Sequence, residues 1–138
     1  MGDRHRSSNR IWISFLVIQL VKMVQMQCSG WWEQAGFGRQ PMSDLQLTFS
    51  NGRIFGRGTD MVGDFEMHGE LVGDKIYLHK QYTGKHAIEY HGMSIGEGAY
   101  KGTWSCYGYP GGNWFIAVVR FSEAANDLTS EVKEIDGT

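Results

Sequence analysis

The chain has 138 residues, of which 41% are hydrophobic and 20% are charged, an ordinary composition for one globular domain. Its 13 Lys and Arg residues against 15 Asp and Glu residues give a net charge of −2 without a basic stripe, so a dedicated nucleic-acid binder is not expected. The 19 glycines follow no Gly-X-Y period, which excludes collagen and indicates many turns, and two cysteines do not make a disulfide scaffold.

Residues 1–24 differ in composition from the rest of the chain. Residues 1–10 carry a net charge of +2, and the stretch that follows is uncharged and mostly apolar, which is the order found in a secretory signal. That stretch is too short to span a membrane as a helix. Three interpretations stay open: a signal or membrane anchor, an extension ahead of a true start at Met23 or Met26, and an amphipathic segment packed on the domain or on a partner. The first would indicate a secreted protein and the second a cytoplasmic one, and membrane contact is expected only if residues 11–24 act as an anchor.

Between residues 25 and 121 apolar and polar residues alternate, and glycine-containing turns interrupt the pattern every 8–12 residues. The clearest turn is Asn51-Gly52, because these residue types adopt the positive φ angles of a type I′ hairpin turn. The connections are too short for helical crossovers, so consecutive strands should pair antiparallel. The expected strands span residues 25–35, 42–50, 53–60, 64–71, 75–82, 86–93, 99–106 and 113–121.

Eight short antiparallel strands in an open sheet would leave two unpaired edges, which promote aggregation. Closure into a barrel removes both edges, and a barrel of about eight strands either fills with side chains or holds one small ligand. We therefore predict an all-β, eight-stranded antiparallel up-and-down barrel over residues 25–121, followed by an acidic tail over residues 122–138 with a net charge of −4. A flattened sandwich of two sheets is the structural alternative.

Two groups of motifs resemble known β-barrels. The segments Ser29-Gly30-Trp31-Trp32 and Gly102-Thr103-Trp104, together with the eight-strand meander, are similar to the calycin superfamily, above all to its avidin-like and lipocalin-like barrels. A small family of uncharacterised β-barrel domains is similar over about residues 28–120, through the spacings Gly56-x-Gly58-x-Asp60-x-x-Gly63-x-Phe65 and Lys80-x-Tyr82-x-Gly84-x-His86-x-x-x-Tyr90-x-Gly92. The resemblance implies a small barrel. The polar residues that avidins place around biotin do not line up with this sequence, so the resemblance implies no particular ligand.

Alternation assigns an inner face to each strand. Along residues 75–82, Ile76 and Leu78 share a face with Lys80 and Tyr82, and this aliphatic face is expected to be interior. The same reasoning places further groups inside: Ile54, Gly56, Gly58 and Asp60; Phe65, Met67, Gly69 and Leu71; His86, Ile88 and Tyr90; Gly102, Trp104 and Cys106. The glycines at 56 and 58 would give room to a bulky neighbour such as Trp104, or mark strong coiling of the strand.

In such a meander one rim receives the ends of the third and fifth strands and the start of the sixth. Asp60, Lys80, Tyr82 and His86 should therefore converge at that rim, with Tyr90 deeper and beside Trp104. The two longest expected connections, Gly36–Pro41 and Tyr107–Gly112, reach the same rim. This arrangement predicts a wide mouth with polar groups.

An inward Lys80 and Asp60 should form a pair, because an isolated charge inside an apolar barrel costs several kcal/mol. One interpretation is a structural latch that closes the mouth. Another is a pocket in which Lys80, His86 and Tyr82 orient a polar or anionic group of a small ligand above an apolar interior. A third is acid/base catalysis by His86, with Asp60 orienting the imidazole.

We expect a non-catalytic binding module for a small polar or anionic ligand, with no cofactor and no nucleic-acid partner. Its candidate ligand-binding residues are Asp60, Lys80, Tyr82, His86, Tyr90 and Trp104. The first alternative is a protein-interaction or homo-oligomerisation domain with a filled core, for which the aromatic segment Tyr107–Trp114 offers contact area. The second alternative is a calycin-like enzyme that uses His86 and Tyr82 as acid and base.

Other chemistry has little support in the sequence. His86 and His91 are five residues apart on one strand and face opposite sides, so no metal site is expected. Cys28 and Cys106 fall on strands that are not neighbours, and free thiols are expected. Gly56-x-Gly58 precedes a strand rather than a helix and is not a nucleotide-binding fingerprint.

Overall fold

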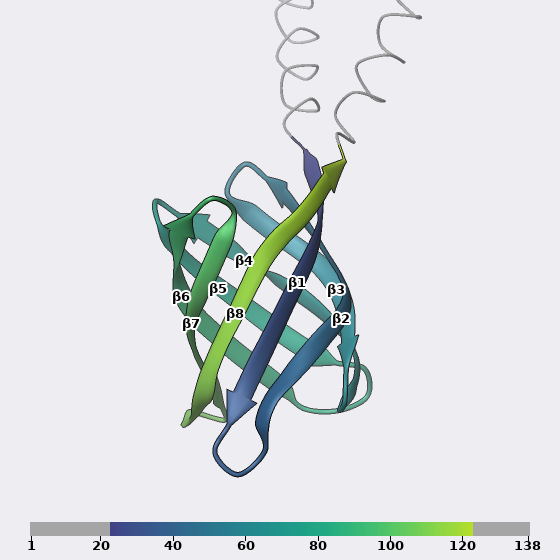
Figure 1. The fold of residues 1–138 in the computed structure, drawn as a ribbon, viewed down its shortest axis with the longest axis vertical. Coiled ribbons are helices and arrows are strands. Elements are labelled where there is room, and N and C mark those ends of the chain that lie inside the picture. Colours follow the sequence, from purple (N-terminus) through teal and green to yellow (C-terminus); the bar gives the residue numbers. More distant parts are fainter. Residues whose placement is uncertain (1–22, 123–138) are drawn as a thin grey trace, which may run out of the picture.

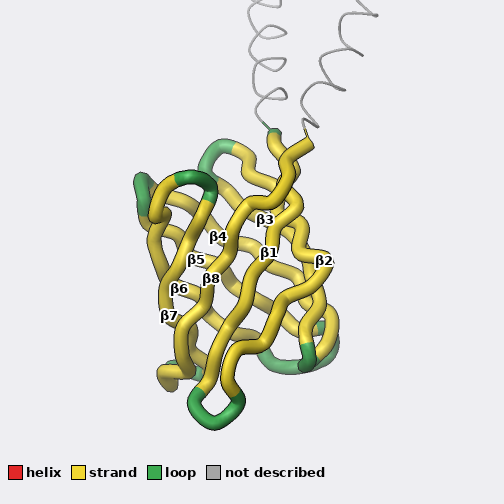
Figure 2. Tube along the Cα trace, viewed as in Figure 1, coloured by secondary structure: helices red, strands yellow, loops and turns green. Residues whose placement is uncertain are grey.

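The computed structural model describes residues 23–122, and the regular structure in that range is entirely β-strand (Figure 2). Eight antiparallel strands follow one another around a closed barrel, and β8 pairs with β1 to complete it (Figure 1). The strands are β1 (Val24–Gln34), β2 (Gly38–Ser50), β3 (Arg53–Asp60), β4 (Gly63–Val72), β5 (Lys75–Tyr82), β6 (Ala87–Gly96), β7 (Ala99–Cys106) and β8 (Tyr109–Ser122). The predicted eight-stranded up-and-down barrel is confirmed, and the flattened sandwich is excluded.

Tight turns fix the register of the hairpins. Asn51 and Gly52 have φ angles of 51° and 80°, as the predicted type I′ turn requires. Glu97-Gly98 and Tyr107-Gly108 show the same pair of positive φ angles. In each pair the glycine occupies the second position at no steric cost, so two residues suffice to reverse the chain.

The interior follows the predicted alternation. On β5 the residues Ile76, Leu78, Lys80 and Tyr82 are buried, while those between them are half-buried or exposed. The aromatic residues of the core are Trp32, Phe65, Tyr82, Tyr90, Tyr100, Trp104 and Trp114. Gly58 makes room for the ring of Phe65, and not for Trp104, because a Cβ there would lie 2.6 Å from that ring.

Two predicted connections are wrong. Gly36–Pro41 is not a long loop, since β2 begins at Gly38 and Pro41 pairs with Trp31 inside the β1–β2 hairpin. Pairing of β2 with β3 begins only at Ser43, so the missing N–H of Pro41 lies on a part of β2 without a second neighbour.

The second wrong connection is Tyr107–Gly112, because β8 already begins at Tyr109. The glycines there serve packing instead of looping. A Cβ on Gly111 would lie 2.0 Å from the ring of Trp104, and one on Gly112 would lie 1.9 Å from the carbonyl oxygen of Glu33. Glycine content alone does not separate these two uses.

The two ends of the barrel differ. Connections 35–37, 61–62, 83–86 and 107–108 lie at one end, which we call the mouth. The first and last described residues lie at the opposite end, as Figure 1 shows. Exposed apolar and aromatic side chains cluster on or beside the mouth turns, namely Phe37, Met61, Tyr107 and Tyr109.

The expected N-terminal segment and acidic tail lie outside the described residues, except that β1 begins at Val24 and β8 ends at Ser122. Within residues 23–122, no helix has the length and apolar character that crossing a membrane requires.

Gly69 gives a test of how tightly the barrel is coiled. A Cβ at this position would lie 1.8 Å from the carbonyl oxygen of Tyr77 on the neighbouring strand. We expect Gly69→Ala to lower the free energy of unfolding by about 1–3 kcal/mol, because the backbone must shift to accept the methyl group. Urea unfolding measures this, with Glu70→Ala on the outer face as a control that changes stability by less than about 0.5 kcal/mol. Equal stability of the two variants would contradict the close approach.

Candidate functional site

The carboxylate of Asp60, at the end of β3, is the centre of a buried polar cluster. Its Oδ2 accepts hydrogen bonds from Lys80 Nζ at 2.6 Å, Tyr82 Oη at 2.7 Å and Trp32 Nε1 at 3.1 Å. Its Oδ1 accepts the backbone N–H of Val62 at 2.9 Å, in the turn that follows β3. With four donors the charge is well solvated by the protein, although the side chain is 0% exposed.

Lys80 enters this cluster from β5, and its side chain is 1% exposed. Besides its bond to Asp60, the ammonium donates to Tyr90 Oη at 3.2 Å and lies 3.8 Å from the sulfur of Met42. Aromatic rings surround the rest of the charge and add cation–π attraction. Their centroids lie 4.2–5.8 Å from Nζ and belong to Phe65, Tyr82, Tyr90 and Trp32.

Burial and pairing act in opposite directions on the titration of this pair. Burial lowers the pKa of Lys80, the bond to Asp60 raises it, and the net value is about 8 against an ordinary 10.5. For Asp60, burial raises the pKa, but the bonds from Lys80, Tyr82 and Val62 outweigh burial and leave it below its ordinary value. At neutral pH the two groups therefore form an ion pair, while the amine loses its proton more easily than a surface lysine.

The two phenols beside the pair stay protonated. Burial is the main cause that raises the pKa of Tyr82 and Tyr90, and the negative charge of Asp60 adds to it. The hydroxyl of Tyr82 donates to Asp60, whereas the hydroxyl of Tyr90 has the sulfur of Met42, 3.8 Å away, as its acceptor. A thioether is a weak acceptor, so the proton of Tyr90 is available to a better partner.

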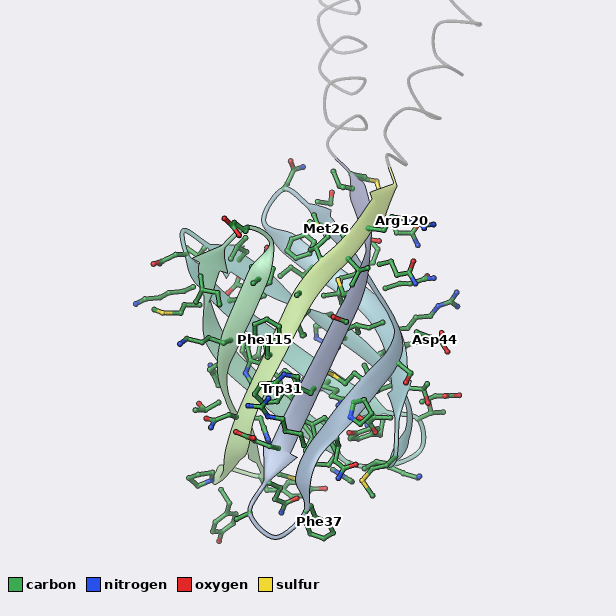
Figure 3. The ribbon with its side chains drawn as sticks, in the orientation of Figure 1. Met26, Trp31, Phe37, Asp44, Phe115 and Arg120 are labelled. Carbon is green, nitrogen blue, oxygen red and sulfur yellow. The ribbon has the colours of Figure 1, made fainter. Side chains whose placement is uncertain are left out.

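A cavity of about 210 Å³ opens between the cluster and the mouth. Its apolar wall is formed by Trp32, Val62, Ile88 and Trp104, and its polar groups come from Gln34, Lys80, Tyr82, His86, Tyr90 and Cys106. Figure 3 draws the side chains as sticks and labels Phe37 at the mouth end of the barrel. The interior of the barrel is therefore open on the mouth side of the cluster and filled with side chains on the other side.

The structure brings the predicted site residues together, with two distinctions. Lys80, Tyr82, His86, Tyr90 and Trp104 line the cavity, but Asp60 does not, because it lies behind the groups that it holds. The ring of His86 packs against that of Tyr82 in a tilted arrangement, with centroids 5.2 Å apart and an angle of 53° between the ring planes. The bonds to Asp60 come from Trp32, Lys80, Tyr82 and Val62, so the His86–Asp60 pair required by the catalytic interpretation does not form.

Sequence reasoning missed Trp32 and Met42. Trp32 donates to Asp60 and packs edge-to-face on Trp104, with ring centroids 5.9 Å apart. Cys28 and Trp32 are four residues apart on β1 and therefore lie on the same face of the strand, which was a signal that Trp32 points inward. Met42 gave none, because it was expected at the start of a strand rather than inside the β1–β2 hairpin.

Cys28 and Cys106 are both free. Burial raises the pKa of Cys28 to about 11, which keeps it a thiol. Cys28 thus belongs to the core, and Cys106 lies at the edge of the cavity.

No model of a known protein family, no curated protein and no solved structure matches this chain. A function for the protein therefore has to be inferred from the geometry of its site.

The Lys80–Asp60 pair makes a quantitative prediction about stability. Lys80→Met and Asp60→Asn should each lower the free energy of unfolding by about 3–5 kcal/mol, because each leaves its partner buried and unpaired. The double variant should lose at least about 1 kcal/mol less than the sum of the two single losses. Chemical denaturation of the four proteins measures the cycle.

The exposed pair Arg39–Glu33, with an N–O distance of 3.3 Å, is the control. Arg39→Met should change stability by less than about 1 kcal/mol. Additive losses in the Lys80–Asp60 cycle would show that the two charges are not coupled.

The lowered pKa of Lys80 predicts how stability changes with pH. Between the native pKa of about 8 and the ordinary value of 10.5, the unfolded chain binds a proton at this residue that the native chain has released. This residue therefore contributes stability that rises with pH across that window, by up to about 3 kcal/mol. Urea unfolding at pH 7.5 and pH 10 should show this rise in the native protein relative to Lys80→Met, and a parallel response of the two proteins would refute it.

Proposed function

We propose that the barrel is a non-catalytic binding module of calycin-like type, which holds a small polar or anionic ligand at its mouth. The observation that carries the proposal is the cavity of about 210 Å³ above the buried ion pair. A latch alone would need the pair but not the space above it.

The size of the cavity limits the ligand. A core cavity of about 150 Å³ holds a benzene molecule, and pockets for drug-sized molecules run from about 300 Å³ upward. A cavity of about 210 Å³ therefore suits a molecule of one ring with a short substituent, or an aliphatic one of similar size.

The polarity of the cavity indicates how such a ligand is oriented. Lys80 lines the cavity and Asp60 lies behind it, so the cationic end of the pair faces the ligand. The hydroxyl of Tyr90 offers a proton, and the structure gives the imidazole of His86 no hydrogen-bond partner among the described residues. Trp32 and Trp104 supply flat apolar surface for the body of the ligand.

A second candidate is a protein-interaction domain. It is supported by the exposed aromatic and apolar side chains around the mouth, where Phe37 is 62% exposed, Tyr107 80% and Tyr109 76%. An enzyme using Tyr82 and His86 as acid and base has weaker support, because the proton of Tyr82 is held by Asp60.

The test is binding of one-ring probes by the full chain. Benzoate and benzyl alcohol should change the fluorescence of the two tryptophans that line the cavity. Ile88→Phe should weaken this binding at least about tenfold, or about 1.4 kcal/mol, because the larger side chain fills the space. Val119→Phe on the outer wall, where Val119 is 67% exposed, should bind as the native protein does.

Circular dichroism checks that both variants fold. Native mass spectrometry of the purified chain provides a second readout, since a retained small molecule should appear in the native protein and be lost in Ile88→Phe. Failure of both probes to bind, with no retained molecule, would exclude the binding module and favour the interaction domain.

A further inference from the structure

The primary amine of Lys80 is in an unusual position. Among the lysines that the structure describes, Lys80 is buried, whereas Lys75, Lys85 and Lys101 are exposed. The side chain of Lys80 lines the cavity, and its amine is held by Asp60 and Tyr90 rather than by bulk water. A molecule in the cavity would therefore lie beside the Lys80 side chain, whose amine is surrounded by aromatic rings.

We propose that Lys80 forms a reversible imine with a small aldehyde bound in the mouth cavity. This inference rests on the proposed binding function of the same cavity and names the chemical class of its ligand.

The step balances without an oxidant or a reductant. The neutral amine attacks the carbonyl carbon, and a new C–N bond forms in a carbinolamine. The carbinolamine then loses its oxygen as one water molecule, the C–O bond breaks, and a C=N bond to Lys80 remains. A proton from the surroundings converts this imine to its cationic form.

The charge of the product selects aldehydes over other electrophiles. Acylation would turn Lys80 into a neutral amide and leave the carboxylate of Asp60 buried without its cation. Reaction with carbon dioxide would place a second anion beside Asp60. A protonated imine keeps one positive charge on the same nitrogen, 2.6 Å from Asp60 in the unreacted protein, so the buried ion pair survives the reaction.

The surroundings of the amine also supply what the reaction needs. Burial lowers the pKa of Lys80 to about 8, although Asp60 raises it, so a large fraction of the amine is neutral near pH 8. Two further titratable groups lie around Nζ: Tyr90 on β6, which accepts a hydrogen bond from it at 3.2 Å, and Tyr82 on β5. His86 lines the same cavity. The apolar wall limits the water that would hydrolyse the imine.

The groups that pack against the amine of Lys80 come from strands β1 to β6. Asp60 on β3, Tyr82 on β5 and Tyr90 on β6 are its titratable neighbours, and none is a second cation. The remaining contacts are uncharged and come from Trp32, Met42 and Phe65. The proton balance of Lys80 therefore depends on one carboxylate and on burial.

The experiment is labelling of the full chain with benzaldehyde and sodium cyanoborohydride, which reduces an imine to a stable benzylamine. Peptide mapping by mass spectrometry then gives the rate at each lysine. At neutral pH we expect Lys80 to be labelled at least about tenfold faster than Lys75, because a pKa near 8 leaves far more neutral amine than an ordinary lysine has. Its rate should level off above about pH 8. Labelling confined to Lys75, Lys85 and Lys101 would overturn the proposal.

Two controls separate this proposal from the binding function. Benzyl alcohol in excess should protect Lys80 in the native protein without protecting Lys75. Ile88→Phe should lose labelling at Lys80 and keep it at the exposed lysines. If benzyl alcohol binds but Lys80 is not labelled, the imine proposal fails and the binding module stands. If neither benzoate nor benzyl alcohol binds, no retained molecule is found and Lys80 is not labelled, both proposals fail.

Discussion

The ammonium of Lys80 inside an apolar barrel is the constraint on which the rest of the site depends. A buried charge is tolerated only where protein groups take the place of water around it. Here six strands each supply one such group. Asp60 comes from β3, and the others are Trp32 on β1, Met42 on β2, Phe65 on β4, Tyr82 on β5 and Tyr90 on β6. These groups meet around the amine when the sheet curls into the barrel, so the fold supplies the solvation of this charge.

This arrangement also reconciles the latch and the pocket, which the sequence left as alternatives. The carboxylate of Asp60 accepts hydrogen bonds from the groups that surround it, and it does not line the cavity. The side chain of Lys80 forms the ion pair with Asp60 and also lines the cavity. One ion pair can therefore stabilise the fold and still present a polar group to a ligand.

Side-chain alternation was enough to predict the barrel, the inner faces of its strands and the Lys80–Asp60 pair, because period two in a half-buried strand is a direct consequence of its geometry. It failed where glycine and proline have two meanings. Pro41 and Gly111 were assigned to loops. Pro41 instead lies in the β1–β2 hairpin, on a part of β2 that does not pair with β3, and Gly111 leaves room for the ring of Trp104. That Asp60 lies behind the cavity could not be predicted, since parity gives the face of a residue but not the direction in which its side chain reaches.

The placement of the chain ends has a consequence for how the barrel can be attached. Gln25 pairs with Ser122 at the end opposite the mouth, so the described chain enters and leaves on that side (Figure 1). A tether, a fused domain or a solid support joined there would leave the opening facing outward. Molecules in the surrounding fluid would then reach the exposed aromatic side chains of the mouth first.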